Sequence, residues 1–197
     1  MPLAAALDLV TAAHRGGYAV GYFESWNLES LQGVIDAAEQ TRSPIIIGFN
    51  GEFLSHPSRR TEERIAWYGA LARAAAESAR VPCGLLFNEC AREAPIYEAI
   101  TAGFSMVMLD DPAAAPTELQ RRVAELVRYA HGHGVAVEAE VGELPCGADG
   151  SVTAHAGLTD PASAAEFVAA TGIDILAVSV GNVHIHVSGE QDLDLDH

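Results

Sequence analysis

Cysteine and long apolar runs are both scarce in this chain of 197 residues. Its three cysteines include no Cys-x-x-Cys pair and cannot all be bridged within one chain, so we expect a reducing, cytoplasmic setting. No apolar run approaches the roughly 20 residues that a membrane span requires. The apolar N-terminus, MPLAAALDLV, lacks a basic region and contains Asp8, so we interpret it as an opening helix and not as a signal peptide.

Positive charge is also scarce, because 11 Lys and Arg oppose 27 Asp and Glu and the net charge at pH 7 is −16. A chain of this charge repels nucleic acid and anionic membranes, so we expect neither as a partner. A phosphorylated ligand would need local cations, a metal or backbone N–H groups at its site. The composition is globular, with 49% hydrophobic residues, and the length suits one domain with a sizeable core.

Short apolar runs recur along the sequence, and most of them are continuous. Continuous runs are typical of strands in a parallel sheet that is buried on both faces. Segments with helical periodicity lie between the runs, including one that Asn27 can cap and one that begins at Pro161. The predicted strands are residues 18–23, 44–49, 83–87, 105–109, 135–141 and 173–180.

Repeated β-α units without a glycine-rich phosphate fingerprint favour a (β/α) barrel over a Rossmann sheet. A full (β/α)8 or TIM barrel has eight units and about 250 residues. This sequence supplies about six units, which we assign to a single domain over residues 1–197. We therefore predict an incomplete α/β fold of the TIM-barrel class, either a barrel fragment or a barrel that needs a partner to close.

Polar residues, many of them acidic, stand at the end of each predicted strand, where a barrel places its chemistry. Glu138 and Glu140 stand out among them, because they lie two apart and share one face of an apolar strand. Unpaired carboxylates are costly in a barrel interior, so a metal, a hydrogen-bond network or a water-filled mouth must compensate. Any one of the others could equally be a helix cap. These others are Glu24, Asn50, Gly51, Glu52, Asn88, Glu89, Asp110, Asp111, Gly181, Asn182 and His184.

Four segments carry a family likeness: GGYAVGYFESWNLESLQGVIDAAEQTRSPIIIG, AITAGFSMVMLD, VAVEAEVGEL and TDPASAAEFVAATGIDILAVSVGNVH. With them the chain resembles the class II, metal-dependent fructose/tagatose bisphosphate aldolases over nearly all of its length. The resemblance implies a (β/α)8 barrel that forms a homodimer or larger homo-oligomer. It also implies a carbon–carbon lyase for a phosphorylated sugar, in which zinc polarises the ketone of dihydroxyacetone phosphate and stabilises an enediolate.

The resemblance assigns roles to residues at three strand ends. His184 would be a zinc ligand, and Glu140 and Asp110 would line a secondary metal position. In the family, a His-x-Asp-His motif ends the third strand, where the Asp exchanges a proton with the substrate and the last His binds zinc. Here those two positions are Asn88 and Glu89. Asn88 cannot act as an acid or base, because an amide does not titrate in the useful range, whereas Glu89 can bind a metal through oxygen.

Other positions also depart from the family pattern. After the fifth strand the family has Gly-Gly-x-Glu-Asp, whose Glu abstracts the substrate proton, but here that role falls on Ala148, with Asp149 adjacent. Glu24 stands where the family has Asn, and Ile185 stands where it has Gly. The third zinc histidine and the phosphate-binding loops belong to strands seven and eight, beyond the six units of this chain.

Two functional hypotheses follow. In the first, the chain is an aldolase-family enzyme with a remodelled metal site, in which Glu24, Asn50 and Gly181 contact the substrate and Asp149 or Glu143 is the base. Its largely oxygen ligands favour Mg²⁺ or Mn²⁺ over zinc. Ordinary aldolase turnover is not expected, because each lost acid–base role typically contributes 10²–10⁴-fold.

In the second hypothesis, the chain is a non-catalytic sugar-phosphate-binding or regulatory relative that acts in an oligomer. An open barrel must bury its sheet edges against something, which favours such a role. A truncated chain whose remainder carries the other ligands is a third possibility, and it would not restore an acid or base at Asn88 or Ala148.

Overall fold

The structure is a computed structural model that describes residues 2–61, 63–141, 158–182, 193–194 and 196. One sheet of six parallel strands runs through it, and each strand pairs with the next one along the chain. The strands are β1 (Gly21–Glu24), β2 (Ile45–Asn50), β3 (Cys83–Cys90), β4 (Met106–Leu109), β5 (Ala136–Glu140) and β6 (Ile175–Ala177).

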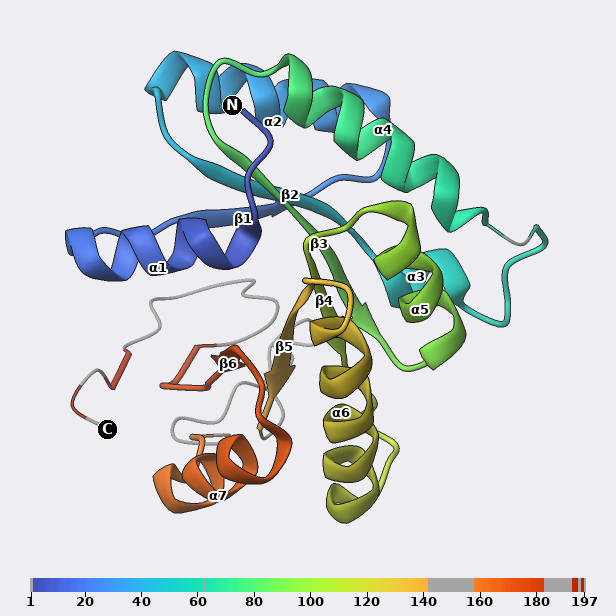
Figure 1. Ribbon diagram of the computed structural model, residues 1–197, viewed down its shortest axis with the longest axis vertical. Coiled ribbons are helices and arrows are strands. Elements are labelled where there is room, and N and C mark those ends of the chain that lie inside the picture. Colours follow the sequence, from blue (N-terminus) through green and yellow to red (C-terminus); the bar gives the residue numbers. More distant parts are fainter. Residues whose placement is uncertain (1, 62, 142–157, 183–192, 195, 197) are drawn as a thin grey trace.

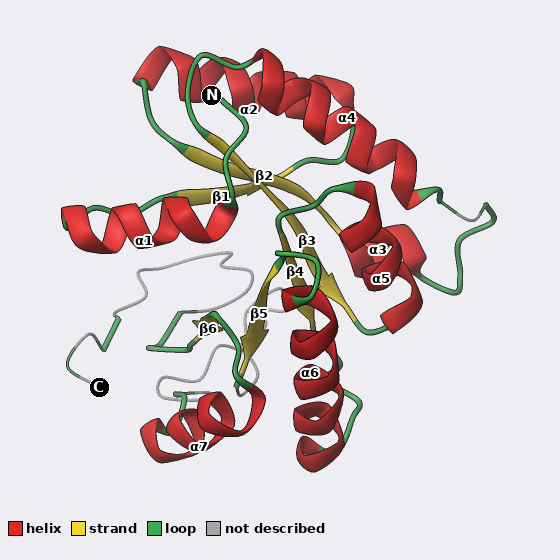
Figure 2. Cartoon of the chain, viewed as in Figure 1, coloured by secondary structure: helices red, strands yellow, loops and turns green. Residues whose placement is uncertain are grey.

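The helices that connect the strands lie on the outside of the sheet, which curls into a half-barrel, whereas α1 precedes the first strand (Figures 1 and 2). The helices are α1 (Ala6–Gly16), α2 (Leu28–Thr41), α3 (Gly51–Ser55), α4 (Ile65–Ser78), α5 (Glu93–Ala102), α6 (Pro116–His131) and α7 (Pro161–Thr171). The predicted parallel α/β fold with about six of the eight units of a TIM barrel is confirmed. Strands β1 and β6 are the two edges of the described sheet.

Apolar residues cover both faces of the sheet, as the continuous runs predicted. The larger cluster fills the space between the sheet and the outer helices, and its most buried members include Phe49, Phe87 and Leu126. A smaller cluster lies on the concave face, where Ala6 and Leu9 of α1 pack against side chains from β2 to β5. Helix α1 thus covers the amino ends of the strands, and the polar residues are left to the opposite ends.

Helix α2 begins as its sequence predicted. The side chain of Asn27 accepts a hydrogen bond from the amide of Ser30 at 2.8 Å, and the Ser30 hydroxyl accepts one from the amide of Asn27 at 3.1 Å. This reciprocal capping box satisfies two amides that would otherwise lack partners at the start of the helix.

Replacing Asn27 with alanine is expected to lower the free energy of unfolding by about 1 kcal/mol, because the amide of Ser30 loses the side-chain oxygen of Asn27 as its acceptor. The melting temperature should fall by roughly 2–4 °C. Thermal unfolding followed by circular dichroism measures the change. Asn27→Asp keeps the side-chain acceptor and is the control, and an equal loss in both variants would contradict the capping explanation.

In the described part of the chain, no helix is long and apolar enough to cross a membrane.

Candidate active site

Polar side chains gather at the carboxyl ends of the first strands, as predicted. Tyr22 and Glu24 lie two residues apart on β1, so both face the same side of the sheet. Asn50, the last residue of β2, pairs in register with Asn88 on β3, and both side chains are buried, with 6% and 8% of their surface exposed. On the other side of β4, Glu138 pairs with Met108.

The end of β3 differs from its prediction. The strand does not end at Phe87 but continues to Cys90, because Asn88 pairs with Asn50 of β2 and Cys90 pairs with Leu109 of β4. The register with β4 shifts between Phe87 and Cys90, so two residues of β3 oppose one residue of β4. Glu89 adopts a positive φ of 39° at this β-bulge, a conformation that non-glycine residues rarely take.

The bulge reverses the alternation of side chains along β3. In a regular strand Asn88 and Glu89 would face opposite sides. Here the Asn50 amide donates to a carboxylate oxygen of Glu89 at 2.8 Å, so Glu89 lies on the same side as Asn50. Cys90 belongs instead to the outer core, where it is fully buried. One inserted residue therefore brings an amide and a carboxylate into the same interior.

Carboxylates crowd this interior. Burial and the charge of Glu89 raise the pKa of Glu138 to about 7. Burial also raises the pKa of Glu24, helped by Glu89, while hydrogen bonds from Asn50 and Asn88 partly lower it. The charge of Glu89 therefore disfavours the charged forms of both Glu24 and Glu138.

Tyr22 completes the cluster of polar groups in this interior. Its hydroxyl donates to Glu24 at 3.4 Å. Burial, followed by the charges of Glu24 and Glu89, raises the pKa of Tyr22 above its ordinary value. The hydroxyl therefore stays protonated and serves as a hydrogen-bond donor at neutral pH.

The donor set of this cluster fits a hard divalent cation. Carboxylate and amide oxygens are the ligands that Mg²⁺ and Mn²⁺ prefer, and a cation would offset the repulsion of Glu89 with Glu24 and with Glu138. Among the described residues alone, no group of three or more His, Cys, Asp or Glu side chains is arranged to hold a metal ion. The nitrogen ligand expected at His184 lies outside the described residues.

The remaining predicted site residues fall in two groups. Asp110 follows β4, with its amide bonded to the carbonyl of Cys90 at 3.2 Å, and Glu140 is the last residue of β5, on the same face as Glu138. Gly181 follows β6 with a positive φ of 98°. His184, Glu143, Ala148, Asp149 and Ile185 lie outside the described residues.

Two contributors were missed from the sequence. Tyr22 lies in a strand that is otherwise apolar, so nothing in its own neighbourhood indicated a site. It is two residues from Glu24, and this spacing could have placed both side chains on the same face of the strand. Arg122, on α6, contacts the loops after β3 and β4, and no signal in a helical sequence distinguishes it from its exposed neighbour Arg121.

Comparisons with known proteins match the sequence and the fold of this chain to one family. The family model for class II fructose-bisphosphate aldolase matches residues 4–197. A probable fructose-bisphosphate aldolase of Bacillus subtilis is 34% identical over 98% of this chain, and the fructose-bisphosphate aldolase of Thermus caldophilus is 31% identical over 99%. The crystal structure of the YdjI aldolase of Escherichia coli superposes with a TM-score of 0.81 at 33% identity, over 98% of this chain.

The chain spans about two thirds of the length of these relatives: 67% of the Bacillus protein, 62% of the Thermus protein and 66% of YdjI. The shared part contains the six strands and the helices between them. Members of class II depend on a divalent metal and are lyases. Because the family match extends over nearly the whole sequence, the chain belongs to the class II fructose-bisphosphate aldolase family.

Proposed function

We propose that this chain binds a divalent cation and a phosphorylated ketose or its three-carbon half, and promotes enolisation or carbon–carbon cleavage with altered chemistry. The observation that supports it best is the bulge in β3. It turns Glu89, at the position where the family has a zinc-binding histidine, into the interior that holds Glu24 and Glu138. When bound, a divalent cation polarises a substrate carbonyl and stabilises the enediolate.

The residues of the chain then have separate roles. Glu89 would hold the cation together with Asp110, Glu140 and His184, through mostly oxygen ligands that suit Mg²⁺ or Mn²⁺ as well as zinc. Asn50 orients Glu89 by its hydrogen bond of 2.8 Å.

The substrate would contact polar side chains in the same interior. Asn88 would donate a hydrogen bond to a substrate hydroxyl without exchanging a proton with it, and Glu24 and Gly181 would contact the substrate beside it. Proton abstraction falls to Asp149 or Glu143 in this proposal.

The alternative chemistry for aldolases, a Schiff base with the substrate ketone, requires a lysine side chain. Residues 1–197 contain no lysine, since all 11 basic side chains are arginines. No side chain of these residues can therefore form that covalent intermediate. This supports a cation as the electron sink for the reaction.

A non-catalytic, ligand-binding or regulatory role in a homo-oligomer is the second candidate. It is favoured by Asn88, whose buried amide cannot relay a proton, and by the two edges of the sheet at β1 and β6. A reducing, cytoplasmic setting suits either role, because Cys83 and Cys90 are buried free thiols.

Metal analysis and proton exchange separate the candidates. We expect the purified chain to bind about one Mn²⁺, measured by calorimetry, and to exchange a C3 proton of dihydroxyacetone phosphate for deuterium, followed by NMR. Glu89→Ala and His184→Ala should each weaken cation binding at least tenfold, which corresponds to about 1.4 kcal/mol. Glu77→Gln, on the exposed surface of α4, is the matched control and should bind as the wild type does.

The outcomes are distinct. A chain that binds no cation under excess Zn²⁺, Mn²⁺ and Mg²⁺ overturns the enzymatic proposal. Cation binding with no exchange and no cleavage of fructose 1,6-bisphosphate favours the non-catalytic role instead.

A further inference from the structure

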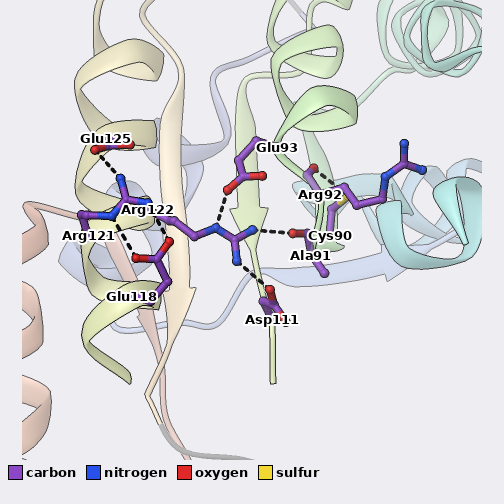
Figure 3. A network of polar contacts seen from close by, with 9 residues as sticks. All are labelled: Cys90, Ala91, Arg92, Glu93, Asp111, Glu118, Arg121, Arg122 and Glu125. Atoms are coloured by element: carbon purple, nitrogen blue, oxygen red, sulfur yellow. Dashed lines mark hydrogen bonds and ion pairs between the residues drawn. The ribbon is translucent and has the colours of Figure 1, made fainter. Parts of the chain in front are cut away.

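Arg122 joins three segments next to the candidate site (Figure 3). Its side chain, only 12% exposed, forms an ion pair with Glu93 at the start of α5 and another with Asp111 after β4 at 2.6 Å. It also donates to the backbone carbonyl of Ala91, after β3, at 2.6 Å. One guanidinium therefore fixes the loop after β3, the loop after β4 and the first turn of α5 relative to α6.

Proposed cation ligands lie beside the first of these loops and within the second. Ala91 is two residues beyond Glu89, whose backbone has the positive φ of 39° at the bulge. Asp111 is adjacent to Asp110, whose amide bonds to Cys90 at 3.2 Å. A residue in a sparsely populated conformation persists only where surrounding contacts over-determine it. Arg122 supplies such contacts on the carboxyl side of the bulge.

The electrostatics keep Arg122 in its charged form. Burial acts against the charge, but hydrogen bonds to Glu93 and Asp111 outweigh it and leave the pKa raised above its ordinary value. Arginine suits this place because its planar fork holds five N–H donors in a fixed geometry, whereas lysine has three donors on one rotatable nitrogen.

We propose that Arg122 is a positioning residue, which holds Glu89 and Asp110 in the geometry that binds the cation. This inference rests on the proposed function. Arg122 acts on them through the backbone at Ala91 and through Asp111, to which its guanidinium donates.

Arg121 provides a matched control on the same helix. It forms ion pairs with Glu118 and Glu125, both at 2.6 Å, but its side chain is 54% exposed and these two partners lie on α6 itself. Exposed pairs of this kind contribute little to stability. The two arginines thus have the same side-chain chemistry but differ in burial and in the segments that they contact.

Arg122→Met and Arg121→Met are compared at a temperature where circular dichroism shows both variants to be folded. We expect Arg122→Met to weaken Mn²⁺ binding at least tenfold and Arg121→Met to change it less than twofold. Arg122→Lys keeps the charge without the fork and should fall between them. A role in stability alone would lower the melting temperature of Arg122→Met and leave its Mn²⁺ affinity unchanged.

Hydrogen exchange of the cation-free proteins tests the positioning without any metal. Peptides that cover residues 88–92 and 109–112 should exchange at least about tenfold faster in Arg122→Met than in Arg121→Met. If Arg122→Met does not fold, Asp111→Asn, which keeps the side-chain shape, takes its place and should shift both readouts in the same direction.

The two proposals fail differently. Unchanged exchange in these peptides, or unchanged Mn²⁺ affinity against a wild type that binds Mn²⁺, overturns the positioning role. A wild type that binds no cation overturns the proposed function, and with it the positioning of cation ligands, even where the exchange of the peptides has changed.

Discussion

Replacing Glu138 with glutamine is expected to stabilise the cation-free protein by about 3 kcal/mol at pH 8. The pKa of Glu138 is raised from 4.5 to about 7 by burial and by the charge of Glu89. Between these values the unfolded chain has released the proton and the native chain keeps it, so the native state loses stability as the pH rises from about 4.5 to about 7. Glutamine is neutral in both states and removes this loss.

The difference between variant and wild type should therefore be absent near pH 4, grow through neutrality and level off at pH 8. A stability change of this size corresponds to a rise of roughly 6–12 °C in melting temperature for a chain of this length. Calorimetric unfolding in the presence of a chelator measures it.

Glu77→Gln changes the same chemical group on the exposed surface of α4 and should follow the wild-type curve. A Glu138→Gln variant that is equally destabilised at pH 4 and pH 8 would show that the glutamine amide, left without a partner, decides the outcome. Added Mn²⁺ should reduce the difference in stability between Glu138→Gln and the wild type, because a bound cation offsets the carboxylate repulsion that the variant relieves.

Replacing Gly48 with alanine is expected to prevent stable folding, at a cost of about 4 kcal/mol or more. A Cβ atom at this position would lie 1.8 Å from the carbonyl oxygen of Leu86 on the neighbouring strand and 3.2 Å from the ring of Tyr22. The nearest atom is backbone, so no rotamer change can relieve the overlap, and β2 would have to move away from β3. The soluble yield and the urea midpoint of the variant measure the effect.

Gly33→Ala is the matched control for this substitution. Gly33 is exposed in the middle of α2, and a Cβ there would meet no atom within 4 Å. Alanine has the higher helix propensity, so this variant should be more stable than the wild type by about 1 kcal/mol. Similar losses in the two variants would contradict the steric explanation for Gly48.

Elements that depend on local sequence were predictable. The capping box at Asn27 and the start of α7 at Pro161 follow from neighbouring residues alone, and both are found where the sequence predicted them. The parallel sheet follows from the continuous apolar runs, because only a sheet covered on both faces needs them. The carboxyl ends of the strands could also be identified as the polar ends, since β-α order fixes their common direction.

The orientation of Glu89 could not be predicted, because it depends on the register of β3 against β4. Strict alternation would place Asn88 and Glu89 on opposite faces of the strand, and no pattern in the sequence around them predicts a bulge. The role of Arg122 depends likewise on partners 11 to 31 residues away, which helical periodicity does not reveal. Site geometry in this fold is therefore set by tertiary pairing, and residue type alone identifies only the candidates.

The bulge at Glu89 has a consequence for how ion preference can evolve in this scaffold. The extra residue in β3, and not the type of side chain, fixes the direction in which residue 89 points. Exchanging an oxygen donor for a nitrogen donor at this position therefore leaves the main chain undisturbed. Histidine tolerates positive φ better than glutamate does, so the present carboxylate holds its place at a higher conformational cost than an imidazole would. Selection could thus change the ion preference of the proposed site one substitution at a time, while the surrounding architecture stays the same.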